Sequence, residues 1–391
     1  MQRVRFGVIG VGGMGVAHAM LIQRIEQTEL AAVCSASEAR TRQVAQQFGV
    51  SGFTDYRELL RSGRVDAVLV ATPHPLHATI AEAAFENGVH VLCEKPLAVS
   101  ISEGRRMVAS AKGRGCLLGV MLQMRTEKPF RIARRAVEEG LIGELLRAHL
   151  IATWCRNQAY YQSAAWRGTW ADEGGGVLMN QAPHHLDLFC WLAGMPRRVT
   201  AQTRTRYHQI EVEDEAFALL EYPNGAHGYL YVSVNEMPPT RRLEVVGERG
   251  KVIVDSEQVT VTCVDPPIAR YMRESTDMWE QPAVRAVELR VPAAEAGHEA
   301  VIRNFAQVVL GQEEQLIAPG GDALGSLELA NAIILSAKRG KAVELPLDEE
   351  EYDALLAELR SASQVKPTTQ EVRRTDPNIA RAIRLEQDVQ E

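Results

Sequence analysis

The sequence predicts an α/β protein, in which a doubly wound parallel sheet is followed by an α+β domain with a mostly antiparallel sheet. Three observations predict this fold class. The chain has 391 residues, too many for one ordinary domain. Its first ~120 residues alternate short apolar runs with amphipathic stretches, and its middle carries longer strand patterns separated by hairpin-like turns. We therefore expect domains at residues 1–123 and 124–345, and a C-terminal helix and polar arm at 346–391.

The first domain contains five runs with strand character. Nearly every residue in these runs is apolar, which is typical of a parallel sheet covered on both faces. The stretches between them have the spacing of amphipathic helices, so we expect right-handed crossovers between parallel strands. The predicted strands are residues 4–9, 30–34, 67–70, 89–93 and 117–120, and the predicted helices are 37–48, 76–87 and 100–112.

The second domain is predicted to hold longer strands, at residues 145–154, 199–206, 216–222, 228–234, 242–246 and 251–254. Two helices, at 298–310 and 322–338, are expected to close it. We expect Asp322 to be the N-cap of the second helix and Gly340 to end it. A charged helix is predicted at 348–360, and the polar arm from residue 365 is expected to make a subunit contact.

Composition excludes several classes of protein. The net charge of −7 lacks the basic footprint of a general nucleic-acid binder. No apolar stretch approaches the ~20 residues of a membrane span, and glycines interrupt the N-terminal apolar run where a signal peptide would continue. The 6 cysteines are scattered without a C-x-x-C pair. We expect a cytoplasmic protein with no disulfide, metal site, membrane or nucleic-acid partner.

A glycine-rich loop follows the first predicted strand and opens a helix. Its residues are Gly10, Val11, Gly12, Gly13, Met14 and Gly15. In this context the glycines permit a tight turn, close approach of the backbone to a pyrophosphate, and packing of helix on strand. The helix N-terminus would then offer its free N–H groups to the phosphates. The loop therefore predicts a Rossmann domain that binds a dinucleotide.

The end of the second strand indicates which dinucleotide is bound. An NAD enzyme usually places an acidic residue there to bind the ribose hydroxyls, but this chain has Ser35. Arg40 follows one helical turn later, where a guanidinium could bind a 2′-phosphate. We therefore favour NADP(H). The alternative is NAD(H), with Glu38 on the ribose and Arg40 merely solvated.

Glu94, Lys95 and Pro96 follow the fourth predicted strand. Ligands of open α/β sheets bind at the carboxyl ends of the strands, and the proline holds Lys95 extended. Interconversion of an alcohol and a ketone needs a group that hydrogen-bonds the reacting oxygen and exchanges its proton. A lysine among apolar walls has a depressed pKa and can serve. The alternative is a surface lysine before a loop proline.

Four motifs occur in order: the glycine loop, TPHPLH at 72–77, EKP at 94–96, and GGGVLMNQAPHHLD at 174–187. Together they resemble the Gfo/Idh/MocA family of NAD(P)-dependent sugar and cyclitol oxidoreductases. The resemblance implies a large open sheet in the second domain and a homodimer or homotetramer. It also implies a cofactor strand similar to that of 1,5-anhydrofructose reductases.

The resemblance assigns roles to individual residues. Lys95 corresponds to the lysine that contacts both nicotinamide and substrate, in a peptide to Pro96 that is often cis, and His184 stands at the catalytic histidine position. The cofactor-binding positions carried over are Thr72, Pro73, His77 and Glu94. The family's common aspartate in the last motif is Asn180 here. An amide cannot hold a proton-relay charge, so we expect Asn180 to orient a substrate hydroxyl.

Spacing supports His184 independently. Asn180, His184 and Asp187 follow an i, i+4, i+7 pattern, which places them on one face if a single helix contains them. Asp187 could then orient the imidazole of His184, and we expect it among the substrate-binding residues. Pro183 could instead mark the first turn of the helix, leaving Asn180 outside it. A metal site is discounted because no further ligand cluster is present.

Aromatic residues are concentrated between residues 154 and 170. Tyr160, Trp166 and Arg167 are the predicted substrate-binding residues of this segment, because flat rings stack on the C–H faces of sugars while polar groups bind the hydroxyls. The alternative is that the rings fill the junction between sheet and helices.

The sequence therefore predicts an oxidoreductase that interconverts a secondary hydroxyl and a ketone on a sugar, glycoside or cyclitol. C3 of a glycoside is one candidate position. Two alternatives remain: glycoside cleavage by transient oxidation and elimination with tightly held NAD, and a non-catalytic nucleotide or sugar sensor. Release of nitrophenol without net cofactor turnover would indicate the first. Cofactor binding without turnover of any sugar would indicate the second.

Overall fold

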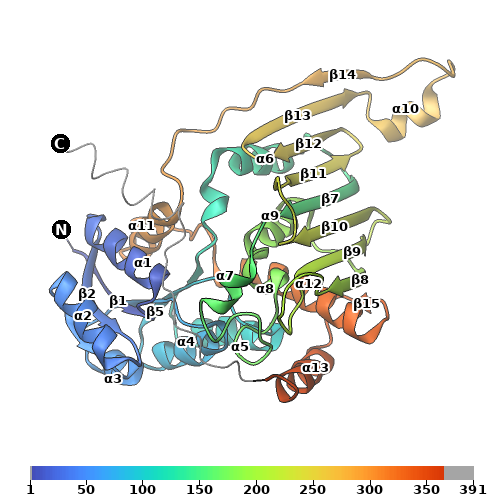
Figure 1. Cartoon of the computed structure of the whole chain (residues 1–391). Coiled ribbons are helices and arrows are strands. Elements are labelled where there is room, and N and C mark those ends of the chain that lie inside the picture. The colour runs from blue at the N-terminus through green and yellow to red at the C-terminus, as the bar shows by residue number, and fades with distance from the viewer. Residues whose placement is uncertain (1, 365–391) are drawn as a thin grey trace.

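The structure is a computed structural model that describes residues 2–364, so the polar arm predicted from residue 365 lies outside the described residues. Two sheets dominate it (Figure 1). The N-terminal sheet has six parallel strands in the order β3-β2-β1-β4-β5-β6. This is the order of a doubly wound fold, with the strand order reversing between β1 and β4. The predicted parallel sheet is confirmed.

The strands of the first sheet are β1 (Val4–Ile9), β2 (Thr28–Cys34), β3 (Ser51–Phe53), β4 (Ala67–Val70), β5 (His90–Cys93) and β6 (Leu118–Val120). The helices between them are α1 (Gly13–Arg24), α2 (Glu38–Phe48), α3 (Tyr56–Arg61), α4 (His77–Glu86) and α5 (Ile101–Gly113), with a 3-10 turn η1 at His74–Leu76. The short strand β3 was not predicted, because Ser51–Phe53 lacks an apolar run.

The second sheet has nine strands in the order β14-β13-β12-β11-β7-β10-β9-β8-β15. Only the β7–β10 pair is parallel, so the expected mostly antiparallel sheet is confirmed. Its strands are β7 (Leu145–Thr153), β8 (Arg198–Arg204), β9 (Glu215–Glu221), β10 (His227–Ser233), β11 (Arg241–Gly247), β12 (Gly250–Asp255), β13 (Gln258–Asp265), β14 (Ala283–Ala286) and β15 (Val343–Glu344). Along β9 buried and exposed residues alternate, because helices cover one face and the other is open.

The helices that follow β6 are α6 (Lys128–Glu138), α7 (Gln158–Gln162), α8 (Val177–Asn180), α9 (Pro183–Ala193), α10 (Ile268–Glu274), α11 (His298–Val309), α12 (Gly320–Arg339) and α13 (Glu349–Ser361), with a 3-10 turn η2 at Gln123–Thr126. Helices α6, α9 and α12 pack on the second sheet (Figure 1). Helix α12 also contacts α5, and so it joins the two halves of the molecule.

Helix α11 packs on the first sheet, which corrects the expectation that it closes the second domain. Its buried face, with Val301, Ile302, Phe305 and Ala306, belongs to the apolar cluster around β1 and α1. The rings of Phe6 and Phe305 lie 6.1 Å apart between centroids. Local pattern predicts the helix but not its partner, because any apolar stripe can pack on either sheet.

The ends of α12 test two predictions about capping. Pro319 is its N-cap, and Asp322 lies in the first turn instead, where its charge still complements the helix dipole. The prediction that Asp322 caps the helix is therefore wrong. Gly340 ends the helix in the left-handed region with φ +63°, as predicted.

Two absences hold for residues 2–364. No helix there is both long and apolar enough to cross a membrane. The six cysteines form no disulfide: three are buried, two are half-buried and one is exposed.

Candidate active site

The glycine loop forms a cradle for a phosphate between β1 and α1. Gly10 has φ +93°, and a Cβ there would stand 2.4 Å from the carbonyl oxygen of Ala71 at the end of β4. A Cβ on Gly15 would stand 1.8 Å from the carbonyl oxygen of Gly10, so only glycine permits this close packing. A Cβ on Gly12 would instead meet open space. Gly12 is the N-cap of α1, and no side chain caps the helix there. The first backbone N–H groups of α1 are therefore available to a pyrophosphate.

Ser35 and Arg40 flank this cradle. Ser35 follows β2, and Arg40 lies in the first turn of α2. The Arg40 Nε donates to the carbonyl oxygen of Val11 at 3.0 Å, which holds the guanidinium beside the glycine loop. Glu38 points to Arg42, whose Nη2 donates to it at 2.6 Å. The strand end therefore carries a hydroxyl and a guanidinium, with the nearby carboxylate already engaged by Arg42.

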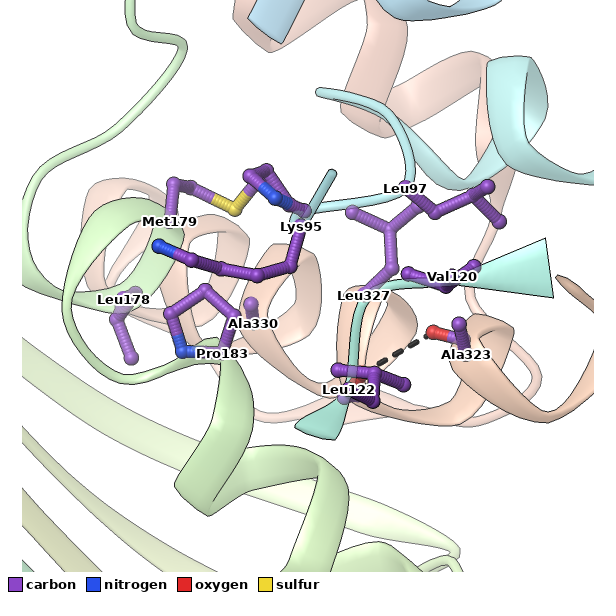
Figure 2. Close-up of a pocket in the computed structure, with 12 residues that line it drawn as sticks. Lys95, Leu97, Val120, Leu122, Leu178, Met179, Pro183, Ala323, Leu327 and Ala330 are labelled. Carbon is purple, nitrogen blue, oxygen red and sulfur yellow. Dashed lines mark hydrogen bonds between the residues drawn. The ribbon is translucent and has the colours of Figure 1, made fainter. Parts of the chain in front are cut away.

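Lys95 lies directly after β5, at the carboxyl edge of the first sheet. Its peptide to Pro96 is cis, in agreement with the resemblance. The Lys95 Nζ donates to the backbone oxygen of Asn180 at 2.8 Å, which crosses from the first sheet to the second half of the chain. Figure 2 shows the side chain extended between Met179 and Pro183, above an apolar pocket.

Burial lowers the pKa of the Lys95 amine, Glu94 opposes this shift, and the charge of Arg167 adds to it. An ammonium group among apolar walls loses hydration, so its neutral form becomes accessible at lower pH. This is the property that an acid–base group needs near a reacting oxygen.

His184 lies in the first turn of α9, directly after Pro183. Its Nδ1 is buried without a hydrogen-bond partner in the described structure, and its Nε2 lies 3.4 Å from the Gln123 Nε2. Burial, followed by the charge of Lys95, lowers the pKa of His184 well below its ordinary value. The ring is therefore a neutral imidazole close enough to Lys95 to sense its charge.

Asn180 ends helix α8, and Pro183 begins α9. The two residues thus lie on different helices, as Pro183 allowed. The Asn180 Nδ2 donates to Glu173 Oε1. Asn180 is half-buried, while Glu173 is fully buried. Asn180 therefore contacts Lys95 through its backbone oxygen and a buried carboxylate through its side-chain amide.

Asp187 does not orient His184, which corrects the expectation from spacing. Its two carboxylate oxygens accept from the Nε and Nη2 of Arg125 at 2.8 and 2.7 Å. Arg125 also donates to Asp322 at 2.9 Å. Asp187 is 2% exposed and both of its oxygens are bound by Arg125, so the expectation that it binds the substrate is also wrong. The heptad-like spacing fails because the register of α9 turns Asp187 toward η2.

Two predicted cofactor residues are engaged by the protein itself. His77 is fully buried, with its ring nitrogens 2.9 and 3.0 Å from the carbonyl oxygens of Pro96 and Thr72. Glu94 Oε1 lies 2.6 Å from the Nε2 of His18 on α1. The side chains of His77 and Glu94 thus support the loops from within, and their contact with a cofactor stays a prediction. Pro73 precedes η1 in the same loop.

The side chain of Thr72, a predicted cofactor-binding residue, has a polar atom that could bind a ligand. Its hydroxyl is buried and has no hydrogen-bond partner in the described structure. The side-chain oxygens of Gln123 and Gln181 are also buried and unpartnered. Buried polar atoms are almost always satisfied in folded proteins, so these atoms around Lys95 and His184 indicate a place where a polar ligand completes the hydrogen bonding.

The aromatic segment divides into two groups. Trp154, Tyr161 and Trp170 are buried and belong to the core, so the alternative interpretation holds for them. The Arg167 guanidinium stacks 4.2 Å from the Tyr160 ring centroid and 4.4 Å from the Trp166 ring centroid. This second group is only partly buried.

The second aromatic group contacts the 72–77 loop and the motif that contains Asn180. Trp166 packs edge-on to His74, with ring centroids 5.7 Å apart. The hydroxyl of Tyr160 accepts from the Gln181 Nε2 at 3.1 Å. The group thus spans from the 72–77 loop, through Trp166, to Gln181 of the last motif, through Tyr160. Arg167 stacks between the two rings.

Sequence reasoning missed Glu173, Gln123, Gln181 and His18. Glu173 directly precedes the glycine triplet of the last motif, and Gln181 lies inside that motif, so both could have been found by asking what flanks it. Gln123 follows β6 at the same sheet edge as Lys95. No local signal identifies His18, because its partner Glu94 is 76 residues away. Within residues 2–364, no group of His, Cys, Asp or Glu has the arrangement of a metal site.

Comparison with known proteins covers both sheets. Residues 4–122 match the oxidoreductase family with an NAD-binding Rossmann fold, and residues 130–253 match the GFO/IDH/MocA C-terminal domain. The chain is 26% identical over 373 residues to D-apiose dehydrogenase of Paraburkholderia graminis, covering 91% of this chain and 93% of that protein. It is 27% identical over 349 residues to 1,5-anhydro-D-fructose reductase of Ensifer adhaerens, covering 87% and 98%.

A solved structure extends this similarity to three dimensions. The WlbA dehydrogenase from Bordetella pertussis, crystallised in complex with NADH and UDP-GlcNAcA, matches with a TM-score of 0.75 and 30% identity. The match covers 89% of this chain and 100% of that one. The two family matches and this structural similarity lead to one conclusion: the chain belongs to the Gfo/Idh/MocA family of oxidoreductases.

Proposed function

We propose that this protein interconverts a secondary hydroxyl and a ketone on a sugar, glycoside or cyclitol, with NADP(H) as the favoured cofactor. The observation that carries the proposal is the position of the Lys95 amine. It stands at the carboxyl edge of the first sheet, bound to the Asn180 backbone and within electrostatic reach of His184. Relatives of this chain include D-apiose dehydrogenase and 1,5-anhydro-D-fructose reductase.

Each residue has a task in this reaction. The glycine cradle would hold the pyrophosphate of the dinucleotide, whose nicotinamide would supply the hydride acceptor or donor. Lys95 and His184 hydrogen-bond the reacting oxygen and take or return its proton. Asn180, Arg167 and the ring of Trp166 hold the rest of the substrate by hydrogen bonds and stacking.

The preference for the 2′-phosphate is supported by the end of β2. Ser35 replaces the usual carboxylate there, and the Arg40 guanidinium is held beside the glycine loop. A carboxylate would repel a phosphate, whereas a guanidinium forms charge-assisted hydrogen bonds with it. WlbA was crystallised with NADH, so the two cofactors must be compared directly.

We further propose that the protein forms a homodimer or homotetramer in the cytoplasm. The open face of the second sheet exposes Phe217 and Leu219 on β9, 41% and 53% accessible. Apolar side chains gathered on an open sheet are typical of an interface. Light scattering of the purified protein measures the oligomeric state, and a monomer at micromolar concentration would contradict this part.

The experiment that tests the reaction has two stages. Nicotinamide fluorescence is titrated first, with NADPH and NADH in parallel. A panel of aldoses, cyclitols and glycosides is then assayed for cofactor reduction, with a nitrophenyl glycoside included. Cofactor-linked turnover of a panel member supports the proposal. Binding of NADPH without any turnover, or phenol release without net cofactor change, would contradict it.

A further inference from the structure

Glu173 is a carboxylate without a task in the proposed reaction. It is fully buried, and it lies immediately behind Asn180. Its Oε1 accepts from the Asn180 side-chain amide, and its Oε2 accepts from the backbone N–H of Gly168. Its own backbone oxygen binds the His74 Nδ1 at 3.0 Å. The residue therefore connects the loop before the glycine triplet with the 72–77 loop and with Asn180.

The two oxygens of Glu173 are not equivalent. A backbone N–H can only donate, so Oε2 must remain an acceptor. A proton that binds Glu173 must therefore sit on Oε1, the oxygen that faces Asn180. An amide is different, because it carries a donor at one end and an acceptor at the other and can present either to a partner.

We propose that Glu173 is a positioning residue that decides which end of the Asn180 amide faces the substrate, an inference that rests on the proposed function. When Glu173 is ionised, its Oε1 accepts from Asn180 Nδ2, and Asn180 Oδ1 is turned outward to accept from a substrate hydroxyl. When Glu173 takes a proton from solvent, its O–H donates to Asn180 Oδ1. The amide is then reversed, and Nδ2 donates to an oxygen of the ketone.

The surroundings of Glu173 allow this proton exchange near neutral pH. Burial raises the pKa of Glu173 to about 7, while the hydrogen bonds from Asn180 and Gly168 and the charge of Arg167 oppose the rise. Glu173 is thus ionised above neutral pH and protonated below it. The charged and titratable groups that face it are Arg167, Glu213, Lys95, Tyr160, Tyr161 and, at its backbone oxygen, His74.

Glu173→Gln tests the proposal sharply because the geometry fixes its outcome. The Gly168 N–H requires the glutamine oxygen at the Oε2 position, so the glutamine NH2 group must face Asn180 and donate to its Oδ1. The variant therefore imitates protonated Glu173 at every pH. Above pH 7 the KM for a hydroxyl substrate should rise up to about tenfold, the value of one hydrogen bond, while the wild type reaches that KM only at low pH.

Glu213→Gln is the matched control. Glu213 is also fully buried, and burial raises its pKa to about 7. Its Oε1 accepts from the backbone N–H groups of Gly176 and Leu178, and its Oε2 has no partner in the described structure. A glutamine can keep both contacts, so this variant should preserve the pH profile of KM.

Infrared pH-difference spectra of the cofactor-free protein provide a readout that needs no substrate. Across about pH 6 to 8, the range that brackets a pKa near 7, the wild type should show a carboxylic-acid C=O band that Glu173→Gln removes in part. A band unaffected by Glu173→Gln would overturn the proposal, and so would a Glu173→Gln profile that keeps the wild-type step in KM.

A double variant shows whether Glu173 acts through Asn180. Asn180→Ala should abolish the pH step, and adding Glu173→Gln should change KM no further. A further change would overturn the proposal. NADPH fluorescence titration of each variant verifies folding. If no panel member is turned over by the wild type, the proposed function fails, whereas partial loss of the infrared band in Glu173→Gln still identifies Glu173 as a group that titrates in this range.

Discussion

The ion network of Arg125 permits a quantitative test of how the active-site helix is held. Asp187 and Asp322 both accept hydrogen bonds from Arg125, at 2.7 and 2.9 Å. Their exposures differ greatly, because the Asp187 side chain is 2% accessible and the Asp322 side chain 49%. The two aspartates can therefore be compared directly, because they share Arg125 and have similar distances to it but differ in exposure to solvent.

Asp187→Asn should lower the free energy of unfolding by about 3–5 kcal/mol, because it removes the buried counter-charge of Arg125 and leaves only the half-exposed Asp322. Asp322→Asn should cost about 1 kcal/mol or less, since water screens a half-exposed pair. Urea unfolding followed by tryptophan fluorescence measures both. The larger loss corresponds to a shift of the midpoint on the order of 1 M.

Two results would refute this reasoning. Equal losses from both substitutions would mean that burial does not set the strength of the network. A stable Asp187→Asn protein with strongly reduced kcat would mean that Asp187 acts on His184 after all. The expected result is a destabilised protein whose folded fraction retains its kcat at low temperature.

Three further substitutions test the site. Lys95→Ala should reduce kcat by about 10²–10⁴-fold and leave the Kd of NADPH within about threefold. Lys112→Ala, at an exposed position, should change neither. If steady-state kinetics show an unchanged kcat for Lys95→Ala, the lysine takes no part in the reaction. Arg40→Ala should raise the Kd of NADPH by about 10–100-fold, the value of a charge-assisted hydrogen bond, and affect NADH little; equal losses in fluorescence titrations would contradict a 2′-phosphate contact. Gly15→Ala should weaken both cofactors alike, because its Cβ would overlap the Gly10 carbonyl, and a variant that binds normally would show that the loop can move aside.

The first sheet could be predicted closely because its determinants are local. The strand ranges 4–9 and 67–70 match β1 and β4 residue for residue, since a short apolar run between turn residues has few other solutions. The glycine cradle and the placement of Lys95 at the sheet edge follow from motifs within a few residues. The edge strands β14 and β15 could not be predicted, because β14 is exposed throughout and β15 has two residues.

The parts of the site that sequence could not supply depend on distant contacts. Arg125 and Asp187 are 62 residues apart, and nothing in the pattern around either one names the other. Charged residues on helices are usually solvated, so the sequence gives no reason to expect a buried partner for Asp187. Spacing along the chain therefore pairs it with His184, which is close in sequence. The role of Glu173 could not be predicted for a related reason: it depends on the hydrogen bond from the Asn180 side-chain amide, which the sequence does not show.

The packing of α11 on the first sheet has a consequence for folding during synthesis. During synthesis, the strands that will hold the dinucleotide emerge early, but the apolar surface around Phe6 stays uncovered until Phe305 has been added. A nascent chain therefore carries an incomplete nucleotide-binding half until Phe305 of its 391 residues has been added. A fragment that stops after the sixth strand would expose this surface permanently, so such a fragment should aggregate rather than serve as a small independent cofactor-binding protein.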